Sequence, residues 1–393
     1  MWPELDNHRN EKEMNNTIKI PGICLILLAL FSCGGGQSPP ASSAGAAKVE
    51  ILKEPIIAFN PKKYISYRAD KPLKIDGDLK DAQWANAPWT DKFQDIEGPS
   101  LPQPRFATRV KMLWDDLYFY FAAEMEEPDV WAKLKKRDAV IYYDNDFEIF
   151  IDPDGDTYDY YEFEINAFGT EWDLFLPRPY RDGGPAYNAW DIQGLKSAVA
   201  IQGTLNKPGD RDTGWTVEVA IPWAVLKEGA PGSRKPKAGE QWRVNFSRVE
   251  WQTEVINGQY EKIKDSKSGA SLPENNWVWS PQGVINLHYP EMWGFVQFSD
   301  KNGSGEKDTF VEKDVEKAKY ALRKIYYRQR SFLAGNDFYA QDVAALQLAG
   351  EKVPGYKWPP ILETTSGSYR ASLAREDGSG FVVIDQTGRV RER

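Results

Sequence analysis

Alternation of apolar and polar positions predicts short β-strands through most of this chain. In residues 147–151, FEIFI, an apolar residue stands at every second position, so one face of the strand is apolar. The run DPDGD at 152–156 breaks the pattern, because proline cannot donate to a β-ladder and glycine accepts a positive φ. The alternation returns over 160–165 and ends at Asn166. These residues therefore predict a β-hairpin.

The polar face of this hairpin carries Glu148, Glu164 and Asn166, and several tyrosines lie nearby in the sequence. Carboxylates and amides hydrogen-bond to hydroxyl groups, and flat aromatic rings pack against the faces of sugars. The combination predicts a carbohydrate-binding surface. Plainer interpretations remain open, with Glu148 as a solvated strand carboxylate and Asn166 as a turn residue.

Similar alternation recurs along the chain. Further strands are predicted at residues 108–112, 117–124, 195–201, 215–221, 242–251, 277–281 and 293–298. The chain also has 31 glycines and 26 prolines, many of them between these runs. Short strands separated by such turns predict an all-β domain, an antiparallel two-sheet β-sandwich of the jelly-roll or immunoglobulin-like type.

A change of period marks the C-terminal part, residues 301–393. Apolar residues recur at three- and four-residue intervals in 309–331, which predicts a strong helix, and 338–348 predicts a second one. Alternating runs near the end predict a small β-meander at 369–373, 380–384 and 389–392. We expect a sandwich over 56–300 followed by a helical plus small β appendage. The helix stripe is expected to pack on the meander or the sandwich, and docking of a partner protein is the alternative.

The N-terminal part predicts export. Residues 20–31, IPGICLILLALF, follow Lys19 and are as long as the core of a signal peptide but short for a membrane span. The run LFSC that ends at Cys33 resembles a bacterial lipobox, which predicts lipidation of Cys33. A cleaved signal with a chance cysteine is the alternative. Met14 is an alternative start to Met1.

Residues 1–33 are therefore expected to be a signal peptide with a lipobox, and 34–55, rich in serine, proline and alanine, a flexible tether. A lipid at Cys33 predicts anchoring to the outer membrane, on its periplasmic or cell-surface side.

Composition excludes several kinds of site. The formal net charge of -9 argues against a nucleic-acid partner, because phosphate binding needs a basic surface. Only two histidines and two cysteines are present, and they are His8, His288, Cys24 and Cys33. That inventory supplies neither a zinc cluster nor a Cys–His catalytic pair in the mature chain.

Four motifs occur in one order along the chain: IDGD followed by Trp84, FEIFID at 147–152, GWTVEVAIPW at 214–223, and WSP followed by HYPEMWG within 279–294. Over residues 60–299 this order resembles the family 9-like carbohydrate-binding modules. The resemblance implies an antiparallel β-sandwich that binds oligo- or polysaccharide without cleaving it. It also implies structural calcium as the one expected cofactor.

The resemblance also implies site residues. It places a sugar-binding glutamate at Glu148, an asparagine at Asn166 and a first aromatic platform near Tyr142. Where the family has an arginine, this chain has Glu164, which is a departure. That substitution means that sugar specificity cannot be carried over from the family.

Two further sugar contacts are candidates. The resemblance places a second ring in the loop 281–288, which has no tryptophan, and Trp279 is the candidate substitute. A core position is the favoured interpretation of Trp279, with the platform role as the alternative. Arg248 is a candidate to hydrogen-bond a sugar or an acidic saccharide, and a surface salt bridge is the commoner role of such an arginine.

The run at 152–156 is a candidate calcium site, since Asp152, Asp154 and Asp156 offer hard oxygen ligands. It is not an EF-hand, because glycine stands at the fourth place of the run instead of the sixth. A charged hairpin tip without a metal is the alternative.

Carbohydrate binding in glycan capture or use is the favoured function, and two others remain open. A glycoside hydrolase or lyase would need two carboxylates, and Glu148 with Glu164 is a conceivable pair. A haem-binding electron-transfer module would need axial ligands from a lysine or from His288, Met112, Met125 or Met292.

Overall fold

The computed structural model describes residues 52–393. The predicted export signal, the lipidation at Cys33 and most of the tether lie outside the described residues. Within 52–393, no helix is both long enough and apolar enough to cross a membrane.

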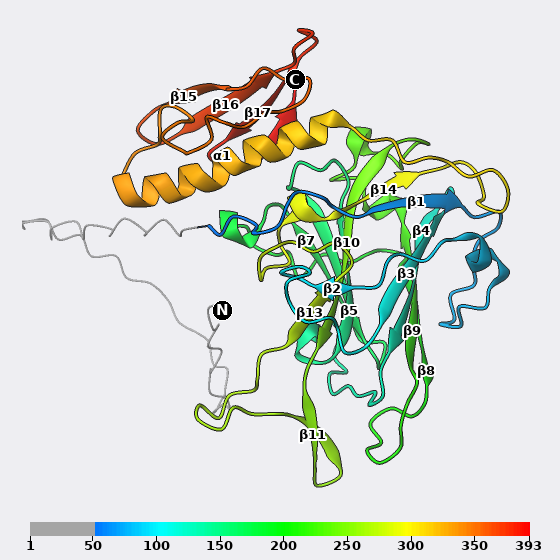
Figure 1. Ribbon diagram of the computed structural model, residues 1–393. Coiled ribbons are helices and arrows are strands. Elements are labelled where there is room, and N and C mark those ends of the chain that lie inside the picture. The colour runs from blue at the N-terminus through cyan, green and yellow to red at the C-terminus, as the bar shows by residue number, and fades with distance from the viewer. Residues whose placement is uncertain (1–51) are drawn as a thin grey trace, which may run out of the picture. The chain divides into compact units, whose positions relative to one another are not determined.

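Two facing layers of β-strands make up the main domain (Figure 1). We call the first layer the site sheet, and its strand order is β7 (Glu171–Leu176), β6 (Tyr160–Asn166), β5 (Asp146–Asp152), β10 (Gln241–Glu250), β14 (Gly294–Phe298) and β1 (Lys63–Arg68), with β13 (Asn275–Val278) beside β10 and β2 (Gln94–Asp95) beside β13. The back sheet continues from β1 through β3 (Thr108–Trp114), β4 (Tyr118–Glu126), β9 (Gly214–Pro222) and β8 (Lys196–Gln202).

The predicted all-β sandwich is confirmed, with one correction to its strand directions. β1 runs parallel to both of its neighbours, pairing through Tyr64 with Val296 of β14 and through Tyr67 with Leu113 of β3. A parallel pair needs a long connection, and here the chain between β1 and either neighbour supplies it. β1 therefore joins the two sheets into one curled strand path.

The core lies between the two sheets, and the alternation seen in the sequence decides which residues enter it. Phe147 and Ile149 of β5 point inward and meet Phe121 of β4 and Val219 of β9 in one cluster. Removing such apolar surface from water stabilises the fold by about 25 cal/mol per Å². Trp279 belongs to the same cluster and is 1% exposed.

Short elements connect the strands. They are the 3-10 helices η1 (Ala82–Asn86), η2 (Ile141–Tyr143), η3 (Tyr180–Asp182), η4 (Trp223–Val225), η5 (Pro231–Ser233) and η6 (Pro290–Met292), and the hairpin of β11 (Thr253–Ile256) and β12 (Gln259–Lys262). Of these, η2, η3, η6 and the hairpin matter most for the site.

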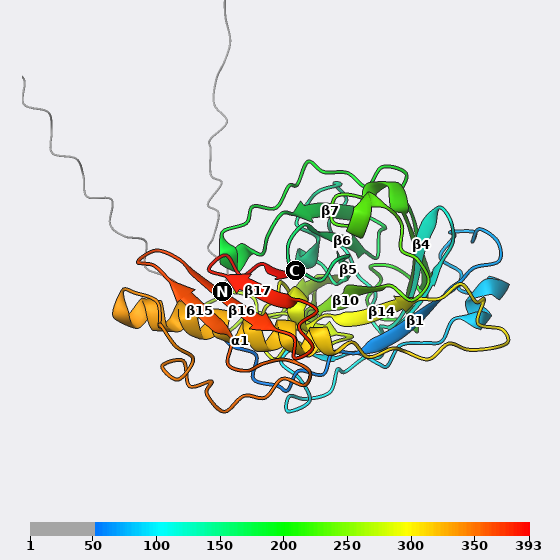
Figure 2. The ribbon, with the colours of Figure 1, turned by 90° about the horizontal axis from the view of Figure 1, so that it is seen from above.

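The appendage contains one helix and a four-stranded antiparallel meander. They are α1 (Asp314–Asn336), β15 (Ile361–Thr364), β16 (Tyr369–Ala374), β17 (Phe381–Asp385) and β18 (Val390–Glu392). Figures 1 and 2 show α1 running along the meander. Its apolar stripe, including Ala318, Leu322 and Ile325, is buried in a core shared with β16 and β17. The stripe therefore packs within the chain, as one of the two predictions stated, and offers no apolar face to a partner protein.

The second predicted helix, at 338–348, is wrong. Asp337 takes a left-handed conformation and its N–H bonds to the Leu333 carbonyl, which ends α1. The side chain of Gln329 then accepts from the Ala340 N–H and donates to the Ala340 carbonyl, both at 2.9 Å. A helix over 338–348 would use the Ala340 carbonyl as an acceptor in its first turn, whereas here Gln329 donates to that carbonyl and the segment forms turns.

Buried ionic contacts join the appendage to the loops of the sandwich. Glu291, in η6, accepts from Arg181 Nη2 at 2.9 Å and from the Tyr327 hydroxyl, and it lies 3.9 Å from Arg323 Nε. All four side chains are at most 8% exposed. Arg181 belongs to η3, whereas Tyr327 and Arg323 belong to α1, so one carboxylate holds residues far apart in the sequence.

The outer face of the site sheet is therefore also covered. Phe150, Tyr160 and Trp293 form a second small core there, together with Leu174 and Leu176. His288 packs against this core, with its Nδ1 2.8 Å from the Tyr160 hydroxyl. Burial, followed by the charge of Arg181, lowers the pKa of His288 to about 3.

Replacing Glu291 by glutamine is expected to lower the free energy of unfolding by about 3–5 kcal/mol, because two buried arginines lose their shared counter-charge. Urea unfolding at neutral pH measures the change. The control is Glu306→Gln, where the carboxylate is 84% exposed beside Lys301, and its effect should stay within about 0.5 kcal/mol. A loss below about 1 kcal/mol for the Glu291 variant contradicts this account.

His288 is expected to make the fold sensitive to acid. The folded pKa lies below the value near 6.5 of an unfolded histidine, so the stabilisation is present above that pH and declines toward about pH 3. The slope from this one proton is about 1.4 kcal/mol per pH unit. His288→Gln should remove this part of the slope in urea unfolding from pH 6.5 to 4.5. Equal slopes for the two proteins would show that His288 does not carry the effect.

Candidate functional site

A row of four side chains crosses the outer face of the site sheet. In register, Trp172 of β7 stands beside Glu164 of β6, Glu164 beside Glu148 of β5, and Glu148 beside Ser247 of β10. Because Phe147 lies in the inner core, period-two alternation places Glu148 on the opposite face. The prediction that Glu148 and Glu164 share one face of a hairpin is confirmed.

Four carboxylates gather along this row, and we call them the acid cluster: Asp146, Glu148, Glu162 and Glu164. One oxygen each of Asp146, Glu148 and Glu164 lies within 4.8 Å of the other two. All four residues are at most 4% exposed. None of them forms an ion pair within residues 52–393.

The acid cluster has perturbed protonation and unsatisfied oxygens. Burial raises the pKa of Glu148 to about 8, and burial together with the charge of Glu148 raises the pKa of each of the other three carboxyls well above its ordinary value. Asp146 Oδ2, Glu148 Oε2 and Glu162 Oε2 have no hydrogen-bond partner among the described residues. An acid in this environment keeps its proton or requires a cationic neighbour.

Asn166 lies next to the acid cluster but is fully engaged in a turn. Its Oδ1 accepts from the N–H groups of Phe168 and Thr170, each at 3.0 Å. Its Nδ2 donates to the Leu134 carbonyl at 2.8 Å and to Asp144 Oδ2 at 3.0 Å. The structure therefore favours the turn interpretation of Asn166.

Arg248 does not lie with Glu148. It shares the inward side of β10 with Phe246, so alternation places it on the other face of the sheet. Its Nη2 lies 2.8 Å from Glu127 Oε2 and 2.9 Å from Glu250 Oε2, and the side chain is fully buried. Arg248 therefore forms a salt bridge, but a buried one and not the surface one considered from the sequence, and its candidate sugar contact is wrong.

The candidate role of Trp279 as a sugar platform is wrong, and its core position is confirmed. Its ring packs in the inner core against Phe246, with ring centres 5.8 Å apart. A Cβ on Gly294 would lie 2.4 Å from this ring, so the glycine is needed for the close approach. A ring that is 1% exposed presents no face to a ligand.

Aromatic side chains beside the acid cluster are accessible, and we call Tyr142, Tyr143 and Trp172 the aromatic patch. The ring centres of Tyr142 and Tyr143 are 5.0 Å apart, and Trp172 lies 6.5 Å from Tyr142. Tyr143 is 53% exposed, whereas the other two are half-buried. The Tyr142 N–H donates to Glu164 Oε2 at 3.1 Å, which joins the patch to the acid cluster.

A lysine from the β11–β12 hairpin completes this surface. Lys262 Nζ lies 3.3 Å from the ring centre of Trp251 and 5.5 Å from that of Tyr143. Burial lowers its pKa to about 8. The patch therefore offers flat rings, a cation and hydroxyl groups at one place.

Several of these groups were not predicted from the sequence. Asp146 precedes Glu148 by two residues, so the alternation could have placed it on the same face. Trp172 and Ser247 could not be placed, because the order of the strands in the sheet is not visible in the pattern. Lys262 reaches Tyr143 only because its hairpin folds back, and the sequence gives no signal of that.

In the expected calcium site at 152–156, two of the three carboxylates already have partners. Asp152 accepts from the N–H groups of Gly155 and Thr157, at 2.9 and 3.0 Å, and Asp156 is paired with Arg389. Asp154 is exposed, and its Oδ1 accepts from the Asp156 N–H at 3.2 Å. These contacts are those of the charged hairpin tip that was the alternative, and calcium at this run stays a prediction. A second acidic group, Asp138, Asp173 and Asp191, already holds Arg137 as its cation.

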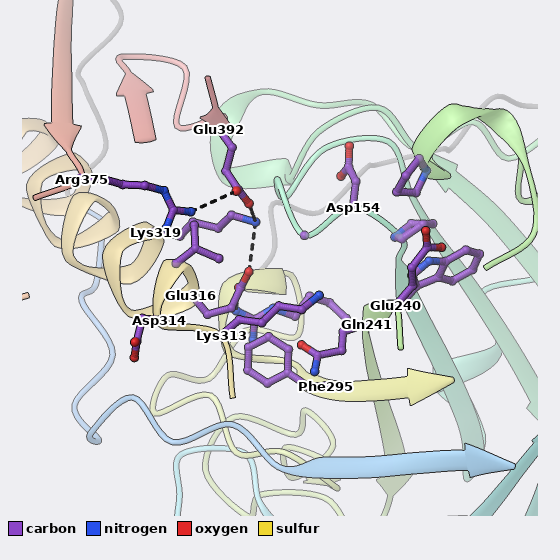
Figure 3. Close-up of a pocket in the computed structure, with 16 residues that line it drawn as sticks. Asp154, Glu240, Gln241, Phe295, Lys313, Asp314, Glu316, Lys319, Arg375 and Glu392 are labelled. Carbon is purple, nitrogen blue, oxygen red and sulfur yellow. Dashed lines mark hydrogen bonds and ion pairs between the residues drawn. The ribbon is translucent and has the colours of Figure 1, made fainter. Parts of the chain in front are cut away.

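A pocket of about 550 Å³ lies between the turn at 152–156, the start of β10 and the appendage (Figure 3). Its charges compensate one another. Lys319 lies 3.1 Å from Glu316 and 3.2 Å from Glu392, and Arg243 lies 2.9 Å from Glu316. With these pairs formed, the charged groups of the pocket already have partners, whereas several carboxylate oxygens of the acid cluster do not.

The pair Glu148 and Glu164 is poorly placed for glycoside hydrolysis. The carboxylates of a glycosidase flank the scissile bond, with separations of roughly 5 to 9.5 Å. Here two oxygens approach within 4.8 Å and both residues are 1% exposed, so a sugar has no room between them.

Residues 75–268 match the family described as Carbohydrate family 9 binding domain-like. Exoglucanase XynX from Acetivibrio thermocellus and Endo-1,4-beta-xylanase A from Thermoanaerobacterium saccharolyticum are each 28% identical to this chain over 116 residues. That stretch is 30% of this chain, but only 9% and 8% of those proteins. A carbohydrate binding module family 9 from Caldicellulosiruptor kristjanssonii, solved with cellotriose, aligns over 63% of this chain and 100% of its own, at 16% identity and a TM-score of 0.40.

The family match covers the hairpin of β5 and β6, the acid cluster and the aromatic patch. It confirms the resemblance seen in the first three ordered motifs, whereas the fourth, within 279–294, lies beyond the matched residues. The chain therefore carries a domain of the Carbohydrate family 9 binding domain-like family, over residues 75–268.

Proposed function

We propose that this protein binds carbohydrate without cleaving it, through the aromatic patch on the edge of the site sheet. The family match over 75–268 is the observation that carries this proposal. The patch supports it, because exposed rings beside polar groups suit the faces and hydroxyls of a saccharide.

The accessible groups differ from those expected from the family resemblance. Glu148, Glu164 and Asn166 are buried, so they do not touch a ligand on this surface, and Glu164 supports the patch by accepting from the Tyr142 N–H. Tyr143 takes the exposed position, with the half-buried Lys262 beside it. A ligand at this place is therefore an oligo- or polysaccharide that lies across rings, with few direct hydrogen bonds.

We also propose that the protein is exported and anchored to the outer membrane by a lipid on Cys33. The lipobox-like sequence LFSC and the apolar run before it support this proposal. An anchored binding protein would keep captured glycan close to the cell.

Tyr143→Ala and Tyr142→Ala are each expected to weaken glycan binding about tenfold, since each removes a stacking ring. A broad glycan array on the purified protein selects the saccharide, and isothermal titration calorimetry measures the affinity. Phe381→Ala is the control, because that ring is 41% exposed but belongs to the appendage. Unchanged affinity in both tyrosine variants, or no glycan bound by the unaltered protein, would argue against this function.

Cys33→Ser is expected to move the protein from the membrane fraction to the soluble fraction of an expressing bacterium, because the lipid attaches at that thiol. Detergent phase partition with an antibody to the protein measures the change. Cys24→Ser is the matched control and should leave the protein in the detergent phase. Release of neither variant, or equal release of both, contradicts anchoring at Cys33.

A further inference from the structure

The acid cluster is a group of buried carboxylates without a counter-charge inside the described residues. Elsewhere in the fold, converging buried acids are compensated. Glu127 and Glu250 share Arg248, and Glu291 is held by Arg181. Asp146, Glu148, Glu162 and Glu164 have no such partner, although each is at least as well shielded from water as Glu291. Burying uncompensated charges is costly, so a bound cation is the simplest way to compensate them.

The hydroxyl oxygen of Ser247 also favours a bound cation. Ser247 is 0% exposed and stands directly beside Glu148 in the strand register, on the same outward side. Its hydroxyl lies on the same face as the Glu148 carboxyl, and Oγ has no hydrogen-bond partner of ordinary geometry among the described residues. A buried hydroxyl without a bond costs about 1–3 kcal/mol unless a ligand satisfies it.

We propose that the acid cluster binds one divalent cation of the Ca²⁺ class, held by Asp146, Glu148 and Glu164 with the Ser247 hydroxyl. The donors are all hard oxygens, and neither histidine nor cysteine takes part, which favours calcium over zinc. Oxygens on opposite sides of a calcium ion are about 4.6–5.2 Å apart, since each lies 2.3–2.6 Å from it. The three carboxylate oxygens here fall within 4.8 Å of one another.

The ion would also position the aromatic patch. Glu164 Oε2 accepts from the Tyr142 N–H, and Tyr142 belongs to the short η2 helix with Tyr143. Fixing Glu164 on a cation therefore fixes the backbone that carries both rings. The cation site does not depend on the proposed sugar binding, because its ligands are buried whether or not a saccharide is present.

The test is calcium titration of the purified protein after treatment with EDTA, by isothermal titration calorimetry and thermal unfolding. We expect one Ca²⁺ per chain and a higher melting temperature with calcium. Glu148→Gln and Glu164→Gln should each weaken binding by about tenfold or more, because each removes a charged ligand. In EDTA both variants should be at least as stable as the unaltered protein, since each relieves repulsion in the cluster. A substitution that weakens calcium binding but does not lower stability in EDTA identifies a metal ligand, because loss of a purely structural residue would lower stability in both conditions.

Asp154→Asn is the matched control, because Asp154 is an exposed acid in the other candidate calcium run. It should bind Ca²⁺ as the unaltered protein does. The proposal is overturned if the unaltered protein binds no Ca²⁺ at millimolar concentration, or if Asp154→Asn removes binding while Glu148→Gln and Glu164→Gln do not. Glycan binding is measured separately, so its presence without Ca²⁺ binding would reject the cation site alone, and the converse would reject the carbohydrate proposal alone.

Discussion

The site sheet is buried on both faces, and this constraint governs the rest of the structure. Its inward face packs against the back sheet, as a sandwich requires. Its outward face is covered by Trp293, the loops near His288 and, beyond them, the appendage. Polar side chains that face outward on β5, β6 and β10 therefore lie in a second interior instead of in water. Each of them must form a hydrogen bond or an ion pair there, because a buried polar group without a partner destabilises the fold.

The chain meets this requirement in most places with specific partners. Arg243 spans the gap between β10 and α1 by bonding to the Trp293 carbonyl and to Glu316. Asn245 exchanges bonds with the backbone of Ser280. Glu291 pairs with the two buried arginines Arg181 and Arg323. On this face of the described residues the acid cluster and the Ser247 hydroxyl beside it lack such partners, which is why their chemistry stands out from that of an ordinary surface hairpin.

Local patterns in the sequence were enough to predict most of the strands, the hairpin of β5 and β6 and the shared face of Glu148 and Glu164, but they did not predict β1, β2, β11, β12 or β15. They were not enough to predict burial. Alternation shows that Glu148 points away from the inner core, but it does not show that this outer side is covered as well, partly by residues distant in the sequence such as Trp293, which packs on Phe150 of the same strand. The same limit explains Arg248, whose partners Glu127 and Glu250 are set by tertiary packing. The failed helix at 338–348 was decided by Gln329, a side chain of another element.

The extent of the outer cover also determines what kind of ligand the protein can hold. Where the cover reaches, over Phe150 and Tyr160, no saccharide can approach the sheet. The cover ends near η2 and the β11–β12 hairpin, where Tyr143 and Lys262 are accessible. A ligand there meets an open surface with a few rings and one cation, not an enclosed cavity. Few contacts and incomplete desolvation favour affinities in the micromolar to millimolar range, so attachment of several copies to one membrane would do more for glycan capture than any single site.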